Sequence, residues 1–290
     1  MSRAETPLIR VVGLHHTYRA GTQLAVHAVR GIDLDIQAGE YVALIGANGS
    51  GKSTLLRHLN ALLLPASGDV WIAGWNTRES SHLRDIRSTV SMVFQVPDSQ
   101  IVATVVEEDV AFGPENLGIP AQQLRHRVDW ALEMVGLADL RHRATHLLST
   151  GQKQRLAIAS ALAMRPRCLL LDEATSMLDP MGREQLLQTV AQLHSDGITI
   201  VSITHQMLEA AQTDRVIVLS EGQVALEGTP RSVFGHPAIL RRVQLDLPQP
   251  TLLAQRVAAH MDTFPRDVLT VPELVEAAAA RWCSPPGNRP

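Results

Sequence analysis

The chain of 290 residues lacks any apolar run near the roughly 20 residues that a membrane-spanning helix needs. Its first seven residues, MSRAETP, are too polar to form the core of a signal peptide. From the sequence we therefore expect a protein that is soluble by itself.

Cysteine is also scarce, and there is no excess of basic residues. Cys168 and Cys283 offer no disulfide framework, and Cys168 lies in an apolar run where we expect a reduced core residue. The 26 basic and 29 acidic residues give a net charge of −3, which argues against nucleic acid as a partner. The apolar content of 45% is enough for the core of one large domain and a small one.

The most informative segment is GANGSGKST at positions 46–54, between an apolar run at 41–45 and the helical pattern LLRHL. A glycine-rich turn between a strand and a helix directs backbone N–H groups and the positive end of the helix dipole at phosphate oxygens. Lys52 can reach the β- and γ-phosphates and Ser53 can bind Mg²⁺. A chance glycine turn is the alternative, but the strand and helix around it favour an ATP-binding loop. The predicted ATP contacts are Gly46, Ala47, Asn48, Gly49, Ser50, Gly51, Lys52, Ser53 and Thr54.

Two acidic residues, Asp172 and Glu173, follow the apolar run at 168–171. Ligands of an open α/β sheet bind outside the carboxyl ends of its strands, so Asp172 can hold Mg²⁺ through water and Glu173 can deprotonate the attacking water. The alternative is a solvated acidic pair that ends a core strand. We disfavour it, because two acids directly after four apolar residues risk an unpaired charge near the core.

A second anion-binding turn precedes the helical pattern at 153–163 and comprises Ser149, Thr150, Gly151 and Gln152, with Ser149 as the expected N-cap. This turn has no lysine and no Mg²⁺-binding hydroxyl partner of its own. It can complete a phosphate site but cannot build one. We therefore expect it to close over a triphosphate held by another copy of the fold, so that the working unit is a dimer.

In their order along the chain these segments resemble an ATP-binding-cassette (ABC) ATPase. The resemblance implies an α/β P-loop NTPase fold with an antiparallel β subdomain, an inserted α-helical subdomain and a small C-terminal extension. It assigns Gln95 to Mg²⁺ or the lytic water and to sensing a membrane partner, Asp179 to the D-loop, and His205 to the γ-phosphate. Taken singly, Gln95 and His205 could each be a polar residue that ends a strand.

Two positions are less certain within this resemblance. Tyr18 matches the aromatic that stacks on adenine in the family, but a tyrosine near the end of a strand can equally be a packing residue. Thr150 stands where the signature motif usually has glycine, so the backbone there is either ordinary or strained. In a heterodimer this half-site could be the weaker one.

Residues 97–120 are similar to the corresponding segment in the ATPases of energy-coupling-factor importers, including the cobalt and nickel type. That similarity implies a groove that grips a helix of a transmembrane scaffold, a separate membrane subunit that binds substrate, and a second ATPase, identical or paralogous. It also implies a peripheral position on the cytoplasmic face of the cell membrane. The alternative for this segment is an acidic, solvated loop with a turn at Gly113-Pro114.

The hydrophobic pattern divides the chain into an ATPase domain at 7–235, with a helical subdomain at about 97–160, a small domain at 236–283 and a disordered tail at 284–290. We expect strands at 9–18, 30–36 and 41–45 in one antiparallel platform, further strands at 91–94, 168–171, 199–203, 215–220 and 224–227, and helices at 122–136, 182–195, 206–212, 252–257 and 271–277.

The sequence thus predicts an MgATP-hydrolysing subunit of an energy-coupling-factor importer that drives uptake of a vitamin or a transition-metal ion. A soluble ABC ATPase acting on nucleic acid or ribosomes is the alternative from another class, but such proteins usually carry zinc modules, coiled-coil insertions or two fused cassettes. An exporter subunit is a third reading, disfavoured by residues 97–120. The sequence does not identify the cargo.

Overall fold

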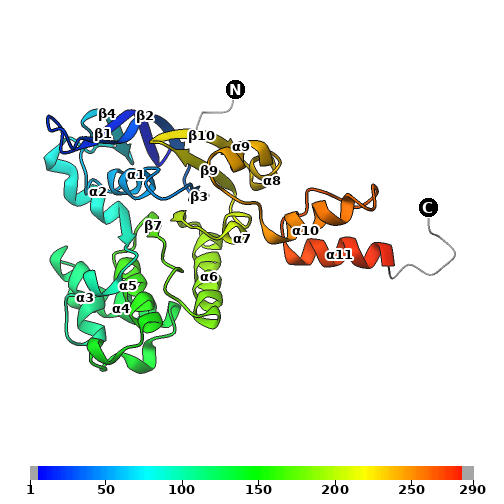
Figure 1. Ribbon diagram of the computed structural model, residues 1–290. Coiled ribbons are helices and arrows are strands. Elements are labelled where there is room, and N and C mark those ends of the chain that lie inside the picture. Colours follow the sequence, from blue (N-terminus) through cyan, green and yellow to red (C-terminus); the bar gives the residue numbers. More distant parts are fainter. Residues whose placement is uncertain (1–5, 283–290) are drawn as a thin grey trace.

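The computed structural model describes residues 6–282 as two β-sheets, a group of helices below them and a helical arm at the C-terminus (Figure 1). The strands are β1 (Ile9–Tyr18), β2 (Val26–Ile36), β3 (Tyr41–Ile45), β4 (Ser67–Ile72), β5 (Trp75–Asn76), β6 (Val90–Val93), β7 (Cys168–Asp172), β8 (Thr199–Ile203), β9 (Arg215–Ser220) and β10 (Gln223–Gly228). The α-helices are α1 (Lys52–His58), α2 (Leu83–Thr89), α3 (Val106–Asn116), α4 (Ala121–Met134), α5 (Thr150–Ala163), α6 (Pro180–Ser195), α7 (Met207–Ala210), α8 (Pro230–Phe234), α9 (Pro237–Arg242), α10 (Gln249–Ala258) and α11 (Val271–Trp282). Short 3₁₀ helices are η1 (Ser80–His82), η2 (Pro97–Ser99), η3 (Ala138–Leu140) and η4 (Thr145–Leu147).

The larger sheet has the strand order β10-β9-β3-β8-β7-β6 and is parallel except for β10. The second sheet is antiparallel with the order β2-β1-β4-β5. The prediction that residues 41–45 join the antiparallel platform is wrong, because β3 pairs in parallel with β8 and β9. All five residues of β3 are buried, which is typical of a central strand covered on both faces, whereas β1 has exposed residues between its buried ones.

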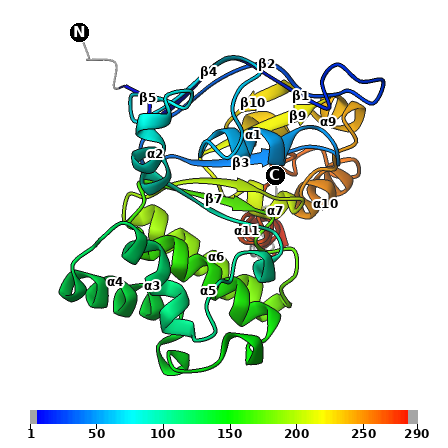
Figure 2. The same cartoon turned by 90° about the vertical axis from the view of Figure 1, so that its left-hand side faces the viewer.

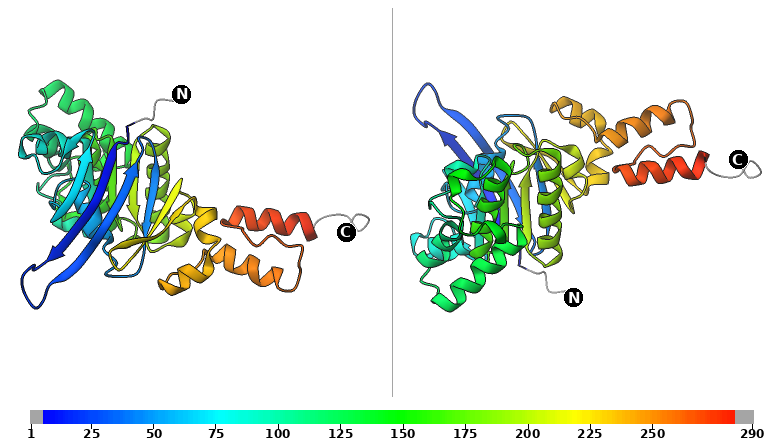
Figure 3. Two further views of the ribbon diagram at one scale, coloured as in Figure 1. Left: turned by 90° about the horizontal axis from the view of Figure 1, so that it is seen from above. Right: turned by 90° about the horizontal axis from the view of Figure 1, so that it is seen from below.

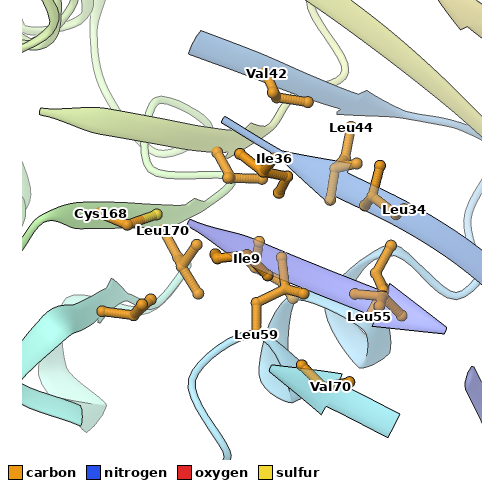
Figure 4. Close-up of a cluster of buried hydrophobic side chains, with 14 of the residues drawn as sticks. Ile9, Leu34, Ile36, Val42, Leu44, Leu55, Leu59, Val70, Cys168 and Leu170 are labelled. Atoms are coloured by element: carbon orange, nitrogen blue, oxygen red, sulfur yellow. The ribbon is translucent and has the colours of Figure 1, made fainter. Parts of the chain in front are cut away.

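Alternate side chains of the central strands enter different cores. Val42, Leu44, Cys168 and Leu170 pack with the antiparallel sheet and with Leu55 and Leu59 of the first helix, as Figure 4 shows. Leu169 and Leu171 point the other way, into a core shared with α3, α4, α5 and α6. The sheet is therefore a middle layer between the antiparallel sheet and the helices (Figure 2). Cys168 is fully buried and free, as predicted.

Most predicted elements have a counterpart in the structure, but the region around Gly113-Pro114 differs from the alternative of a solvated loop. Both residues lie inside α3, which continues to Asn116. A Cβ on Gly113 would lie 2.6 Å from the Met164 sulfur, so glycine permits close packing of α3 against the end of α5. The turn interpretation is therefore wrong, and the acidic residues from Glu107 to Glu115 lie on a helix.

Between β10 and residue 282 the chain forms the four helices α8 to α11. Apolar residues of α8 and α9 cover one face of the parallel sheet beside β9, whereas α10 and α11 extend away from the body (Figure 3). Ala254 and Ala258 of α10 form a small core with Phe264 and Val268 of the connecting segment, and Leu274 and Ala277 of α11 pack against it. The domain boundaries given above stay predictions, and the predicted tail at 284–290 lies outside the described residues. Within residues 6–282, no helix combines the length and apolar character needed to cross a bilayer.

Candidate functional site

The predicted catalytic segments lie at the carboxyl ends of four adjacent strands. The strands lie in the order β3-β8-β7-β6. The loop at 46–51 follows β3, His205 follows β8, and Gln95 follows β6. Asp172 is the last residue of β7, and Glu173 comes directly after it. Because parallel strands end at the same edge of a sheet, segments more than a hundred residues apart meet there. One edge of the sheet thus assembles the phosphate loop, two carboxylates, an amide and an imidazole.

The phosphate loop has a backbone that only glycine adopts readily. Gly51 has φ 102°, and a Cβ there would lie 2.3 Å from the Ala28 carbonyl oxygen. Lys52 begins α1, and its Nζ donates to the carbonyl oxygens of Gly46 at 2.8 Å and Ala47 at 3.1 Å. The ammonium group is therefore held over the concave side of the loop. Burial lowers the pKa of Lys52, and the charges of Glu173 and Asp172 oppose this shift.

Ser53 and Asp172 bring together the oxygen atoms that suit a magnesium ion. The Ser53 hydroxyl donates to Asp172 Oδ1 at 3.0 Å. Burial raises the pKa of Asp172, whereas the Ser53 hydrogen bond and the charges of Arg57 and Lys52 lower it. A hydroxyl beside a carboxylate at a phosphate loop matches the hard oxygen ligands that Mg²⁺ prefers. The residues present fit this ion.

Glu173 is the centre of a second polar cluster. Its Oε2 accepts from Gln95 Nε2 at 2.9 Å, and its Oε1 lies 2.8 Å from His205 Nε2. Because an ionised carboxylate only accepts, His205 Nε2 carries the proton in this pair. Glu173 also has φ 52°, a left-handed conformation that is costly for a side chain other than glycine and is often found at functional sites. The fold thus holds this carboxylate in a fixed, strained orientation between two partners.

Tyr18 lies at the end of β1 beside the first helix. Its hydroxyl is 3.3 Å from Thr54 Oγ1, and its ring meets the His16 ring edge-on with the centroids 4.6 Å apart. Tyr18 is half-buried, so part of its side chain stays accessible. These contacts anchor the tyrosine next to the phosphate loop, and its role toward adenine stays a prediction.

Residues 149–152 form the start of α5 on the helical side of the molecule. The Ser149 hydroxyl accepts from Gln152 N at 3.3 Å, and Gln152 Oε1 accepts from Ser149 N at 2.9 Å, which is a capping box. Thr150 is the first residue of the helix, so its backbone is the ordinary helical one and not strained. Among the described residues no hydrogen bond joins this turn to the phosphate loop. Asp179, in turn, caps α6 by accepting from Gly182 N at 2.9 Å.

An apolar groove, here named the Phe112 groove, lies between the sheet and the helical layer. Its volume is about 310 Å³, and its large apolar lining residues are Leu62, Met92, Phe94, Val102, Phe112 and Met164, beside polar residues that include Arg87 and Asp109. Val102 and Phe112 are 61% and 49% exposed and line the same groove, so two exposed apolar side chains lie together here. Phe94 lines the groove and directly precedes Gln95, so the groove is one residue from the amide that contacts Glu173.

Sequence reasoning missed one buried carboxylate near the site. Glu209 is 8% exposed and accepts hydrogen bonds from the hydroxyls of Thr204 and Thr175, the neighbours of His205 and Glu173 in sequence. Its only signal is an acid in the first turn of a very short helix, and that does not set it apart from a solvated residue. The contact depends on the packing of α7 against the end of β7, which the local sequence does not encode.

Comparison with known families assigns residues 29–176 to the family described as ABC transporter. The chain is 55% identical over 259 residues to the energy-coupling factor transporter ATP-binding protein EcfA1 of Symbiobacterium thermophilum, covering 89% of this chain and 90% of that protein. It is 44% identical over 273 residues to the protein of the same name from Bacillus subtilis, covering 94% and 96%.

Solved structures resemble the fold closely. CbiO1 from Clostridium perfringens, described as part of the ABC transporter complex CbiONQ, has a TM-score of 0.74 at 36% identity and covers 89% of this chain and 100% of that one. The cassette MJ0796, solved as a dimer in a post-hydrolysis state with ADP and Pi, has a TM-score of 0.70 at 30% identity and covers 77% of this chain and 98% of that one.

Proposed function

The chain belongs to the ABC transporter family and, within it, to the energy-coupling factor ATP-binding proteins. We propose that it is an ATPase that drives import across a membrane, by the following mechanism. It hydrolyses ATP, and the predicted ABC ATPase fold is confirmed. The observation that carries the mechanism is the convergence of the phosphate loop, the Ser53–Asp172 pair and the Gln95–Glu173–His205 cluster at one edge of the sheet.

The phosphate loop holds the triphosphate. Its backbone N–H groups and the N-terminus of α1 favour anions, and Lys52, already placed over the loop by two carbonyl contacts, adds a positive charge at the β- and γ-phosphates. The Tyr18 ring, fixed beside Thr54, stacks on the adenine. These groups bind and orient ATP without taking part in bond breaking.

Glu173 is the general base for the attacking water. Gln95 and His205 each occupy one lone pair of a different carboxylate oxygen, and lone pairs remain on both oxygens for the water. The water loses its proton to Glu173 as its oxygen attacks the γ-phosphorus, and the bond to the β-phosphate oxygen breaks. His205, with its proton on Nε2, is placed to turn toward the γ-phosphate oxygens.

Ser53 and Asp172, together with Gln95, would hold Mg²⁺, with Asp172 acting through water. When bound, this ion neutralises charge that develops on the phosphate oxygens. Gln95 contacts Glu173 in the structure, so its amide would have to serve the base and the metal in different states of the cycle. Because Gln95 lies in the segment after β6, a change of its partner would couple the conformation of that segment to the state of the nucleotide site.

Each site is completed by a second cassette, identical or paralogous. Residues 149–152 present a capped helix N-terminus with no bond to the chain's own phosphate loop, and such an N-terminus favours an anion. Ser149, Gly151 and Gln152, with Thr150 on an ordinary backbone, would face the γ-phosphate held by the other cassette. The dimeric state of MJ0796 with ADP and Pi supports this arrangement by analogy.

The Phe112 groove receives a helix of a transmembrane scaffold subunit. Exposed apolar side chains in a concave surface are typical of a protein-binding site. Occupation of the groove would move Phe94 and, with it, Gln95 at the base. The cargo, a vitamin or a cobalt or nickel ion, binds a separate membrane subunit, and this chain sits on the cytoplasmic face of the cell membrane.

Membrane fractionation tests the groove. We expect Val102→Lys, in the groove, to shift the chain from the membrane to the soluble fraction of native cells, because a charge would have to be buried against the partner helix. Leu24→Lys is the matched control, since Leu24 is 65% exposed, close to the 61% of Val102, but lies in the β1–β2 loop. If Val102→Lys stays on the membrane as fully as the parent, the groove is not the docking site.

A further inference from the structure

We infer that Glu209 is a positioning residue for ATP hydrolysis, which fixes Glu173 and His205 relative to each other through two threonine hydroxyls. The inference rests on the proposed role of Glu173 as the base. Within the described residues, Glu209 makes no hydrogen bond or ion pair with the phosphate loop, so its effect on hydrolysis is exerted through its neighbours.

Glu209 lies behind the site in α7, four residues after His205, and is 8% exposed. Its Oε2 accepts from Thr204 Oγ1 at 2.6 Å and from Thr175 Oγ1 at 3.2 Å. Thr204 directly precedes His205, and Thr175 follows Glu173 by two residues. One carboxylate oxygen therefore ties the segment after β8 to the segment after β7.

The Thr204 hydroxyl is fixed on both sides. It donates to Glu209 and accepts from the backbone N–H of Gln206 at 3.0 Å, so hydrogen bonds hold the residues on either side of His205. A hydroxyl that donates and accepts at once polarises both bonds in a low-dielectric site. The imidazole of His205 is thus projected from a segment anchored at both ends.

The Thr175 contact holds the strained part of the loop after β7. The left-handed backbone of Glu173 is unfavourable for a glutamate and persists only when its surroundings enforce it. Backbone bonds from Glu173 N to Ile203 O at 3.2 Å and from Ser176 N to Glu173 O at 3.0 Å fix one side. The bond from Thr175 to Glu209 adds a side-chain anchor between Glu173 and Ser176.

The charge of the buried carboxylate has a nearby counter-ion. Arg183 Nε, on the first turn of α6, lies 3.9 Å from Glu209 Oε1. Oε1 of Glu209 therefore faces the counter-ion Arg183, whereas Oε2 accepts the hydrogen bonds of the two threonine hydroxyls. A glutamine at this position keeps a carbonyl oxygen for both threonines, loses the charge and places an NH₂ group where Oε1 faces Arg183.

The test is steady-state ATP hydrolysis by the full-length chain purified with its bound partners. We expect Glu209→Ala to lower kcat roughly tenfold to a hundredfold, with KM for ATP changed less than about twofold, because the base is displaced while the phosphate loop is not. The double variant Thr175→Val and Thr204→Val removes both donors with little change in volume and should give the same loss. Adding Glu209→Ala to it should cause no further loss, since the three side chains act as one unit.

Glu209→Gln should recover most of the activity lost in Glu209→Ala, which distinguishes an acceptor that positions from a carboxylate needed for folding. Glu184→Ala, an exposed acid on α6, is the control and should hydrolyse ATP like the parent. The inference is wrong if Glu209→Ala keeps the parent kcat, if Glu209→Gln is as slow as Glu209→Ala, or if the valine pair has no effect. If Glu209→Ala does not fold, Glu209→Gln and the valine pair decide. Failure of the proposed function has a different signature, in which Glu173→Gln hydrolyses ATP at the parent rate.

Discussion

Glu173→Gln is the sharpest perturbation of the proposed base, because it replaces an oxygen by an NH₂ group of nearly the same size. In one orientation of the new amide, its oxygen still accepts from Gln95 Nε2 at 2.9 Å. Its NH₂ group then donates to His205 Nε2 across the 2.8 Å contact once the imidazole proton moves to Nδ1, because both partners cannot donate. The change therefore removes basicity and leaves the geometry in place.

Loss of a general base lowers the rate by roughly 10²–10⁴. At about 1.36 kcal/mol for each factor of ten, this raises the barrier by about 2.7–5.4 kcal/mol. Glu173 makes no hydrogen bond to residues 46–54 among the described contacts, so binding of ATP should stay close to that of the parent. We expect a fall in kcat by this factor with KM changed less than about threefold.

Phosphate release over a range of ATP concentrations measures both constants, and calorimetric ATP titration measures binding separately. Glu184→Gln, on the exposed face of α6, is the matched control because it makes the same chemical change outside the site. A Glu173→Gln variant that hydrolyses ATP at the parent rate would refute the assignment of the base. A variant that no longer binds ATP would show that Glu173 serves binding and not only hydrolysis.

Ser149→Ala removes one half of the capping box with Gln152, and we expect a loss of about 1 kcal/mol in the free energy of unfolding, measured by urea denaturation. Tyr18→Ala should weaken ATP binding, measured by titration calorimetry, whereas Tyr18→Phe, which lacks only the hydroxyl that contacts Thr54, should bind nearly like the parent. Burial, the largest cause, and the neighbouring imidazole of His16 lower the pKa of His58 to about 4. Between pH 4 and 6.5 the unfolded chain therefore binds more protons at His58 than the folded chain does. Stability from neutral His58 should be fully present above pH 6.5 and fall by about 3 kcal/mol as the pH drops toward 4, and His58→Leu should flatten this part of the urea-denaturation profile.

A different result would contradict each of these three predictions. Unchanged stability of Ser149→Ala would mean that the capping box adds nothing to α5. Unchanged ATP affinity of Tyr18→Ala would assign Tyr18 to packing alone. A His58→Leu variant with the parent's pH dependence would place the titrating group elsewhere.

The fold was predictable where the hydrophobic pattern is long and regular. The limits of β1, β3, β8 and β9 match the predicted strands, because these runs are bounded by clear turn residues. The partners of β3 were not predictable in the same way. Its five buried residues allow either sheet, and only the full set of parallel neighbours shows which one it joins.

Short elements were harder to predict. The strand β4 begins with Ser67-Gly68-Asp69, which reads as a turn, and only Val70 and Ile72 are fully buried. The helix α8 was missed although Thr229 caps it and Pro230 begins it, a signal that sequence reasoning could have used. Such segments depend on tertiary contacts more than on their own propensity.

In the candidate site, too, some features follow from the local sequence pattern and others depend on tertiary contacts. The phosphate loop, Asp172 and Glu173 stand beside strong apolar runs, so their place at the edge of the sheet follows from the pattern. The contacts of Gln95 and His205 with Glu173 join residues from three strands, and only the strand order brings them together. Glu209 has only the weak signal of an acid in the first turn of a short helix, and its partners are hydroxyls in the segments after β7 and β8.

Purification of the tagged, full-length chain from native membranes, with the bound proteins identified by mass spectrometry, tests the central claim most directly. The account predicts a second cassette, an integral scaffold subunit and a membrane protein that binds the cargo, with the two membrane subunits lost when Val102 in the Phe112 groove is changed to lysine. Recovery of nucleic acid or ribosomal proteins in place of membrane subunits would contradict the importer and leave the ATPase chemistry standing.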